Sequence, residues 1–523
     1  MAIYSFEPFG YEGSLVTVKA ELTTQYRGVT DIIGLPDSAI DSYKKRVRAS
    51  VLDCGFDYPE GRVILNLFPA DLRKSGDRYD LAGALAVLAE KDDFPRSQDT
   101  KVIAYGALTL DGTVVTSHGT TAALETAFAQ GIKYAIIPAS ASIESIDGMV
   151  IIKVTNLREA YEKLCSLEEY EVYEAPPEEE GAVPIPKVNF PVSEVSSPVL
   201  KITFPEGHHL DDILYDSPEM SGMKWAMTLA AAGRLNMLAI GAPGCGKTVA
   251  MQCMDEITPN LTTDEKHSTE RIYSLAGLNK PRTRPLRMPL QTASIEGMLG
   301  GGPECRPGEV SLAHNGALFL DEADEFKSSV LQMLRVPLEN HTITLSRAGR
   351  STTYPANFQL LMATNPCPCG NYGSKNKICL CSLRSISQYW AKFSAPLLDR
   401  VDIRYFFGQV NIPIPEGTDL TTKGIQAMVK KAWETQYKRQ GKLNRDLNPD
   451  EVSALYSSGT TSDAVTLLDR EGTRYGFGVR ARASILKIAR TMADIQGLEK
   501  ITAPCIATAV ALRKIAANGQ PDL

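Results

Sequence analysis

The feature that most constrains this chain is a glycine-rich segment, Gly-Ala-Pro-Gly-Cys-Gly-Lys-Thr, at residues 241–248. It follows residues 235–240, a short apolar run with the composition of a buried strand. The pattern G-x-x-x-x-G-K-[ST] after a strand is typical of a loop that binds phosphate groups, because glycines let backbone N–H groups approach phosphate oxygens. The sequence therefore predicts an α/β nucleotide-binding domain with a mainly parallel sheet.

The predicted ligand of this loop is ATP with Mg²⁺. Lys247 is expected to place its positive charge on the β- and γ-phosphates, and the Thr248 hydroxyl is expected to bind Mg²⁺. The other predicted ATP contacts come from the loop and the residue after it: Gly241, Ala242, Pro243, Gly244, Cys245, Gly246 and Val249.

Two later apolar strands end in polar side chains that suit ATP hydrolysis. The strand 317–320 is followed by Asp321 and Glu322, and the strand 358–363 leads to Asn365. We expect Asp321 to hold Mg²⁺ and Glu322 to polarise the attacking water. Asn365 is expected to contact the γ-phosphate.

Two arginines are candidates for stabilising the charge of the transition state. Arg400 is expected to reach the γ-phosphate of a neighbouring subunit, and the alternative is a salt bridge with Asp399 or Asp402. Arg480 directly precedes an amphipathic helical pattern at 481–495. We expect it to report the nucleotide state from a helical lid, and the alternative is an ordinary surface arginine.

The composition changes sharply near residue 166. Residues 167–180 contain seven Glu, and four prolines follow between 184 and 198. Like charges repel and proline interrupts helices, so we expect an extended linker over 166–198, with a surface loop as the alternative. The predicted domains are therefore an α+β domain at 1–165, the ATPase core at 199–417 and a helical domain at 418–523.

Charge excludes one class of protein and leaves local binding surfaces open. The net charge is −7, which excludes a uniformly basic nucleic-acid coat. Basic side chains nevertheless gather at 271–287 and in a predicted β-hairpin at 343–354. Residues 421–523 carry 16 Lys and Arg against 10 Asp and Glu. We expect DNA to be bound through its backbone, without sequence preference, and the alternative is solvated faces or pairs between subunits. The candidate contacts are Arg282, Arg284, Arg287, Arg347 and Arg350.

Cysteine spacing and hydropathy give two further expectations. Cys367, Cys369, Cys379 and Cys381 form two C-x-C pairs that could hold Zn²⁺, and the alternative is reduced thiols in a loop. No run reaches the roughly 18–20 apolar residues that a membrane span needs, and the first residues lack a secretory signal. We therefore expect a cytoplasmic protein with no membrane partner.

The order of these motifs resembles that of AAA+ ATPases. Residues 306–322 (RPGEVSLAHNGALFLDE), 396–403 (PLLDRVDI) and 485–497 (ILKIARTMADIQG) resemble the magnesium-chelatase-like branch, and 32–40, 44–56, 64–76 and 106–112 resemble the front domain of the ComM/YifB family. The resemblance implies a Lon-protease-like (ribosomal S5 domain 2-like) front domain, an AAA+ P-loop core and a helical lid. It also implies a hexameric homo-oligomeric ring that acts as a DNA helicase, promoting branch migration in natural transformation and recombination.

The same resemblance leaves an alternative and contains departures. A chelatase-type motor that remodels a protein partner is the alternative, although chelatase subunits of this branch lack the front domain. Residues 76–81 contain no Ser and Thr121 stands where a Lon-type Lys would, so we expect a non-proteolytic front domain. Leu290-Gln291 stands where relatives have two His, and Ser484 replaces an Arg.

Overall fold

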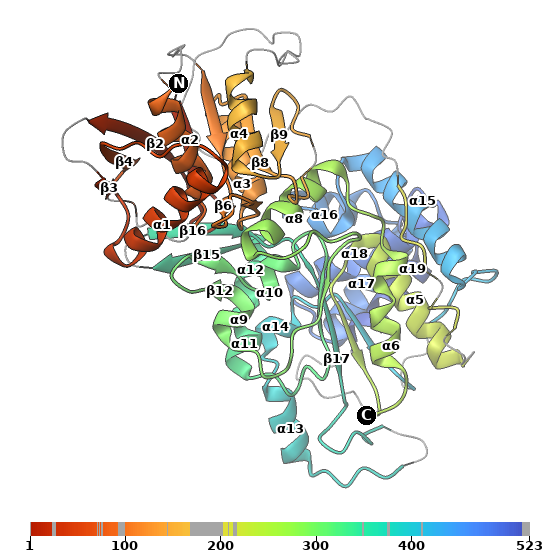
Figure 1. The fold of residues 1–523 in the computed structure, drawn as a ribbon. Helices are drawn as coiled ribbons and strands as arrows, with labels where there is room; N and C mark the ends of the chain where they lie inside the picture. The colour runs from red at the N-terminus through yellow and green to blue at the C-terminus, as the bar shows by residue number, and fades with distance from the viewer. Residues whose placement is uncertain are drawn as a thin grey trace.

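The computed structural model describes residues 2–23, 28–70, 72, 74, 77–92, 100–143, 145–167, 202–207, 209–212, 217–347, 350–373, 377–408 and 412–514. Apart from its first two residues, the predicted linker lies outside these ranges. The described chain forms two large sheets and a group of C-terminal helices (Figure 1). Among the helices described, none is long and apolar enough to cross a membrane.

The N-terminal part is built on a seven-stranded mixed sheet of order β3-β4-β2-β1-β5-β8-β9. Its strands are β1 (Ala2–Glu7), β2 (Ser14–Thr23), β3 (Thr30–Ile33), β4 (Arg62–Phe68), β5 (Lys101–Ala104), β8 (Tyr134–Pro138) and β9 (Val150–Val154). Its helices are α1 (Asp37–Asp53), α2 (Asp80–Lys91), α3 (Thr120–Ala129) and α4 (Leu157–Cys165). A hairpin of β6 (Ala107–Leu108) and β7 (Val114–Val115) turns at Gly112, which has a φ of 80°. The expected mixture of strands and helices is confirmed.

The central part is a five-stranded sheet of order β11-β14-β17-β10-β18, in which every pair of neighbours is parallel. Its strands are β10 (Met237–Ile240), β11 (Leu286–Arg287), β14 (Ala317–Leu320), β17 (Gln359–Thr364) and β18 (Ile403–Phe406). β10, β14 and β17 confirm the three strands predicted from sequence. Parallel strands end at one edge of a sheet, so the residues after these three strands meet there.

Helices surround the central sheet and continue to the C-terminus. They are α5 (Pro218–Gly233), α6 (Lys247–Gln252), α7 (Met254–Ile257), α8 (Thr263–Ala276), α9 (Ile295–Leu299), α10 (Glu309–Leu312), α11 (Ser328–Met333), α12 (Arg335–Asn340), α13 (Leu383–Ala391), α14 (Ala395–Leu398), α15 (Thr422–Gln440), α16 (Pro449–Ser457), α17 (Ser462–Arg474), α18 (Val479–Gln496) and α19 (Ala503–Arg513). Trp433 of α15 is fully buried and donates its indole N–H to the Ala231 carbonyl of α5 over 3.1 Å, which fixes the C-terminal helices to the core.

The front domain lies against α8 and against the hairpin of β15 (Thr342–Arg347) and β16 (Arg350–Pro355), as Figure 1 shows. One apolar cluster contains residues of the front domain, of α8 and of the hairpin, including Phe6, Ile272 and Tyr354. The Tyr11 N–H donates to the Thr352 hydroxyl over 2.9 Å. β15 and β16 pair antiparallel, which confirms the predicted hairpin at 343–354. Its second strand is in contact with the front domain.

Arg271 of α8 contacts two residues of the front domain, Glu125 and Tyr11. It pairs with Glu125, donates from Nε to the Tyr11 carbonyl over 3.1 Å, and lies 4.9 Å from the centre of the Tyr11 ring. Hydrogen bonds to charged groups contribute about 1.5–3 kcal/mol each. We expect Arg271→Ala to loosen the docking and to speed amide hydrogen exchange in β1, β2 and α8 by roughly tenfold or more.

Arg282→Ala is the matched control, since Arg282 is exposed on the same basic segment. It should leave exchange unchanged. Equal exchange in Arg271→Ala and wild type would show that Arg271 does not hold the front domain.

Candidate active site

The phosphate loop leaves a strand that is buried throughout its length. β10 lies between β17, the central strand of the sheet, and the edge strand β18, and the Gly241 N–H donates to the Thr364 carbonyl over 3.3 Å. Gly244 and Gly246 have φ values of 80° and 88°, a region that favours glycine. Residues 241–246 therefore form a tight loop that leads directly into α6, as the sequence predicted.

Lys247 is folded over this loop. Its side chain is only 8% exposed, and its Nζ donates to the carbonyls of Gly241 and Ala242 over 2.7 and 3.0 Å. Burial lowers the pKa of this ammonium group, because a low-dielectric environment disfavours the charge. These two hydrogen bonds place the charge of Nζ directly against the loop backbone.

Thr248 and Asp321 form the oxygen pair expected of a magnesium site. The Thr248 hydroxyl donates to Oδ1 of Asp321 over 3.1 Å. A hydroxyl and a carboxylate at this separation are the hard oxygen donors that Mg²⁺ prefers, with the remaining positions left to water and phosphate. These two residues therefore fit the ion predicted from the sequence.

Glu322 is exposed and has a φ of 48°, an unusual backbone conformation for a residue other than glycine. Its Oε2 accepts a hydrogen bond from Nε2 of Gln291 over 3.4 Å. The carboxylate is thus held by an amide from a separate loop and is accessible to water. Gln291 is one of the departures from the family pattern, and nothing in the sequence marks it as the partner of Glu322.

Asn365 joins the same group from β17. Its Oδ1 accepts from Lys247 Nζ over 3.4 Å, so the amide and the loop lysine are in contact. The segment is held from behind, since the Tyr389 hydroxyl donates to the Asn365 carbonyl over 3.0 Å and the Thr364 hydroxyl donates to Asp324 over 2.9 Å. The structure therefore brings together Lys247, Thr248, Asp321 and Asn365, as the strand ends predicted.

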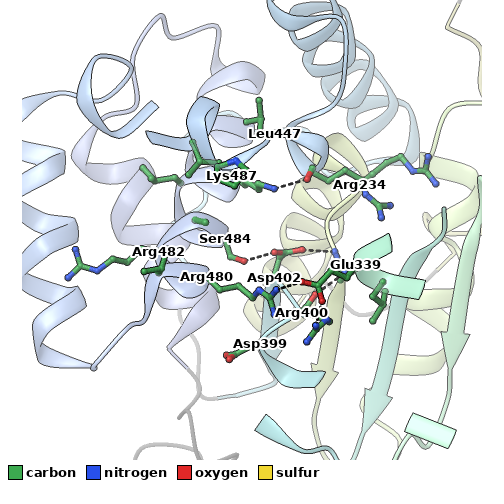
Figure 2. A pocket seen from close by; sticks show the side chains of 18 of the residues that line it. Arg234, Glu339, Asp399, Arg400, Asp402, Leu447, Arg480, Arg482, Ser484 and Lys487 are labelled. Atoms are coloured by element: carbon green, nitrogen blue, oxygen red, sulfur yellow. Dashed lines mark hydrogen bonds and ion pairs between the residues drawn. The ribbon is translucent and has the colours of Figure 1, made fainter. Parts of the chain in front are cut away.

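Arg400 and Arg480 lie elsewhere, beside a cavity of about 860 Å³ between the sheet and the C-terminal helices (Figure 2). Both pair with one carboxylate, that of Glu339 at the end of α12. Among the residues that line this cavity, none belongs to the phosphate loop. The two arginines are thus neighbours of each other rather than of their own chain's phosphate loop.

This arrangement corrects the alternative pairing considered for Arg400. The ion-pair partner of Arg400 is Glu339, not Asp399 or Asp402, because α12 brings a carboxylate from 61 residues away. Asp402 instead accepts from the Ser484 hydroxyl over 2.6 Å, as Figure 2 shows. Glu339 is a residue of this site that the sequence did not reveal.

The structure buries one of the arginines predicted to contact DNA and engages two others in contacts with protein side chains. Arg284 is 4% exposed and donates to Glu265 and to the Pro259 carbonyl over 2.8 Å each, so its burial excludes a DNA contact in this conformation. Arg287 forms two bonds of 2.7 Å with Glu309, and the Arg350 guanidinium lies 3.5 Å from the centre of the Phe9 ring. Arg282 and Arg347 are exposed.

The four clustered cysteines lie directly after Asn365. Their Sγ atoms are all within 4.8 Å of one another, which is close enough for a single metal ion. Cys245 in the phosphate loop is separate from this group. Burial raises the pKa of its thiol, which suits a small packing residue better than a nucleophile.

Asp80, from the stretch 76–81 that lacks a Lon-type Ser, and Thr121, which stands where a Lon-type Lys would, both make structural contacts. Asp80 is fully buried and pairs with Arg46 over 2.6 Å, and the Thr121 N–H donates to the Ser274 hydroxyl over 3.4 Å at the contact with α8. Thr121 is therefore part of the docking surface of the front domain.

The parallel sheet, the phosphate loop and the strand-end carboxylates together define a P-loop ATPase of the AAA+ class. Family models agree with this assignment. "Magnesium chelatase, subunit ChlI" matches residues 216–413, its C-terminal model matches 419–513, and "Subunit ChlI of Mg-chelatase" matches 18–141. Because the front domain itself matches a chelatase description, its presence does not separate the two functional alternatives given above.

Full-length relatives make the family assignment specific. The chain is 32% identical to "Competence protein ComM" of Haemophilus influenzae and 32% identical to "Uncharacterized protein YifB" of Escherichia coli, in each case over 98% of this chain and 97% of the relative. A shorter match, 26% identical over 28% of this chain and 18% of the relative, is to "DNA replication licensing factor mcm7-B" of Xenopus laevis. The chain belongs to the ComM/YifB family of magnesium-chelatase-like proteins.

Proposed function

We propose that the protein is a Mg²⁺-dependent ATPase that assembles into a hexameric ring and couples ATP hydrolysis to movement along branched DNA, as a helicase of branch migration. The observation that carries this proposal is the separation of Arg400 and Arg480 from their own phosphate loop. If these two arginines act on the nucleotide, they must do so on the phosphate loop of a neighbouring chain, because they are clustered away from their own.

The proposed chemistry assigns one role to each residue. Lys247 and the loop N–H groups hold the β- and γ-phosphates, and Asn365 orients the γ-phosphate. Thr248 and Asp321 would hold Mg²⁺, which neutralises charge on the phosphate oxygens. Glu322 polarises the attacking water from its exposed position beside Gln291. Arg400 of the adjoining subunit, with Arg480 beside it, stabilises the charge that spreads over the transferred phosphoryl group.

Glu339 gives this arrangement a means of control. It holds both arginines within one chain, and we propose that they exchange Glu339 for the phosphates of the neighbour when the ring forms. Charge-assisted bonds to a carboxylate and to phosphate are similar in strength, so the exchange costs little. Hydrolysis would then reverse it and move the C-terminal helices, which reach Asp402 through Ser484.

The proposal of DNA as the track rests on local charge and on the relatives. Arg347 is exposed at one end of the β15–β16 hairpin, and a ring repeats that charge around a common axis. The relatives include a competence protein and a DNA replication licensing factor by name. The front domain, which contacts β16, is proposed to act as a non-proteolytic module that positions this hairpin.

A chelatase-type motor acting on a protein partner is the second candidate, and the chelatase family models over all three parts of the chain favour it. The two candidates differ in what stimulates the ATPase. We expect single-stranded and branched DNA to raise the rate of ATP hydrolysis several-fold at low salt, with the stimulation lost as salt is raised. A rate that no DNA changes, together with no DNA binding at low salt, would favour the protein-remodelling motor.

A further inference from the structure

We propose that Cys367, Cys369, Cys379 and Cys381 form a tetrathiolate site for one thiophilic metal ion, which Zn²⁺ fits, and that this ion braces the phosphate loop and Asn365. The metal site stands on the geometry of the cysteines alone. The bracing role deepens the proposed ATPase function and rests on it.

The sulfur positions match the geometry of a single tetrahedral ion. The Sγ–Sγ distances are 3.4 Å between Cys367 and Cys369, 3.7 Å between Cys367 and Cys379, and 3.6 Å between Cys369 and Cys379. Four thiolates at about 2.3 Å from Zn²⁺ lie about 3.8 Å from one another at the corners of a tetrahedron. An iron–sulfur cluster places several atoms between its cysteines and needs wider spacing than the 4.8 Å that encloses all four.

The apolar residues beside these cysteines point the wrong way for a segment held by hydrophobic burial. Ile378 and Leu380, on either side of Cys379, are 82% and 89% exposed, whereas Cys379 and Cys381 are partly buried against the core. Alternate residues of an extended segment face opposite sides, so this segment can bury either its two thiols or its two aliphatic side chains. In the structure it partly buries the thiols. The hydrophobic effect favours the opposite choice. Coordination by the thiolates supplies an interaction that favours the observed one.

The cluster is joined to the ATP site at two points. Asn365 precedes the fully buried Cys367 by two residues, and the Trp390 indole N–H donates to the intervening Pro366 carbonyl over 3.1 Å. Gly370, one residue after Cys369, packs on the phosphate loop. A Cβ added there would lie 2.5 Å from Cδ of Pro243, and its φ is 75°. The loop that carries two of the four thiols therefore touches both Asn365 and the phosphate loop.

Loss of the ion is expected to release this support. Ile378 and Leu380 are exposed and do not anchor the Cys379–Cys381 segment, so without the ion this segment depends on its partly buried thiols. The Gly370 turn would then no longer be joined to the segment through shared thiolate coordination. Pro243 and Asn365 would then sample more conformations, and nucleotide affinity would fall because a loop must be ordered on binding.

The metal site is tested on full-length protein purified under reducing conditions and supplied with Zn²⁺, by elemental analysis and by the absorption spectrum after exchange with Co²⁺. Wild type should hold about one zinc per chain and show the intense thiolate-to-cobalt charge-transfer bands. The Cys369→Ser/Cys379→Ser variant should lose both. Cys165→Ser, at an exposed thiol, and Cys505→Ser, at a buried thiol, are matched controls that should keep both. No zinc in wild type, or equal zinc in the double variant, would overturn the site.

The bracing role is tested on wild-type protein stripped of metal, which avoids any effect of substitution on folding. The affinity for a fluorescent ATP analogue should fall about tenfold or more and return when Zn²⁺ is restored, a size typical of perturbing the surroundings of a site. Unchanged affinity after metal loss would overturn the bracing. Metal binding and restored nucleotide affinity in a protein that never hydrolyses ATP would leave this inference standing and contradict the proposed function instead.

Discussion

Glu322→Gln is expected to bind ATP as tightly as wild type and to hydrolyse it about 10²–10⁴ times more slowly, the usual contribution of a positioned general base. Glu322 is exposed beside Thr248 and Asp321, but its carboxylate takes no part in the hydrogen bonds of Lys247 and Thr248. We therefore expect it to act on the attacking water and not on the binding of phosphate. Glutamine keeps the size and the bond to Gln291 while removing the charge that attracts the proton. The measurement is steady-state phosphate release beside equilibrium binding of ATP.

Glu325→Gln is the matched control for this prediction, because Glu325 is exposed three residues away in the same turn. It should keep the full rate. Lys247→Ala gives the opposite signature, a loss of nucleotide binding itself. A Glu322→Gln protein that hydrolyses ATP at the wild-type rate would remove this residue from the role assigned to it.

Arg400→Ala is expected to reduce ATP hydrolysis by about 10³–10⁵-fold, the range measured for arginines that reach a phosphoryl group from outside its own site. Each chain should still bind ATP, since the Arg400 partners, Glu339 and the Pro396 carbonyl, are not part of the phosphate loop. Arg470→Ala is the control at an exposed arginine of the C-terminal helices and should be active.

Mixing two inactive variants separates a role between subunits from a role within one chain. Arg400→Ala keeps its phosphate loop, and Lys247→Ala keeps its arginine. In a mixed ring, an Arg400→Ala site that lies next to a Lys247→Ala subunit has every part it needs, so ATP hydrolysis should return. If co-assembled variants remain inactive at every ratio, Arg400 does not act on the neighbour's nucleotide.

The ATP site could be predicted from the sequence because it is built from strand ends. The apolar runs before Gly241, Asp321 and Asn365 are short and uninterrupted, and parallel strands bring their ends to one edge regardless of how far apart they lie in the chain. The polar residues that follow each strand were therefore sufficient to predict which side chains lie together, without any information on helix packing.

Contacts between distant surface elements could not be predicted in this way. Glu339 lies 61 residues before Arg400, and nothing in either segment marks the pair. Arg284 and Arg282 look equivalent in the basic segment at 271–287, yet Arg284 is buried by Glu265, whose backbone is fixed in the capping box of α8. The stacking of Arg350 on Phe9 likewise depends on how the front domain docks.

Unwinding of a branched DNA substrate, followed with wild type and Lys247→Ala side by side, tests the proposed motor most directly. The proposal predicts that wild type separates the arms of the junction only when ATP and Mg²⁺ are present, and that Lys247→Ala does not separate them under any condition. Wild-type protein that hydrolyses ATP but leaves every branched substrate intact would contradict it.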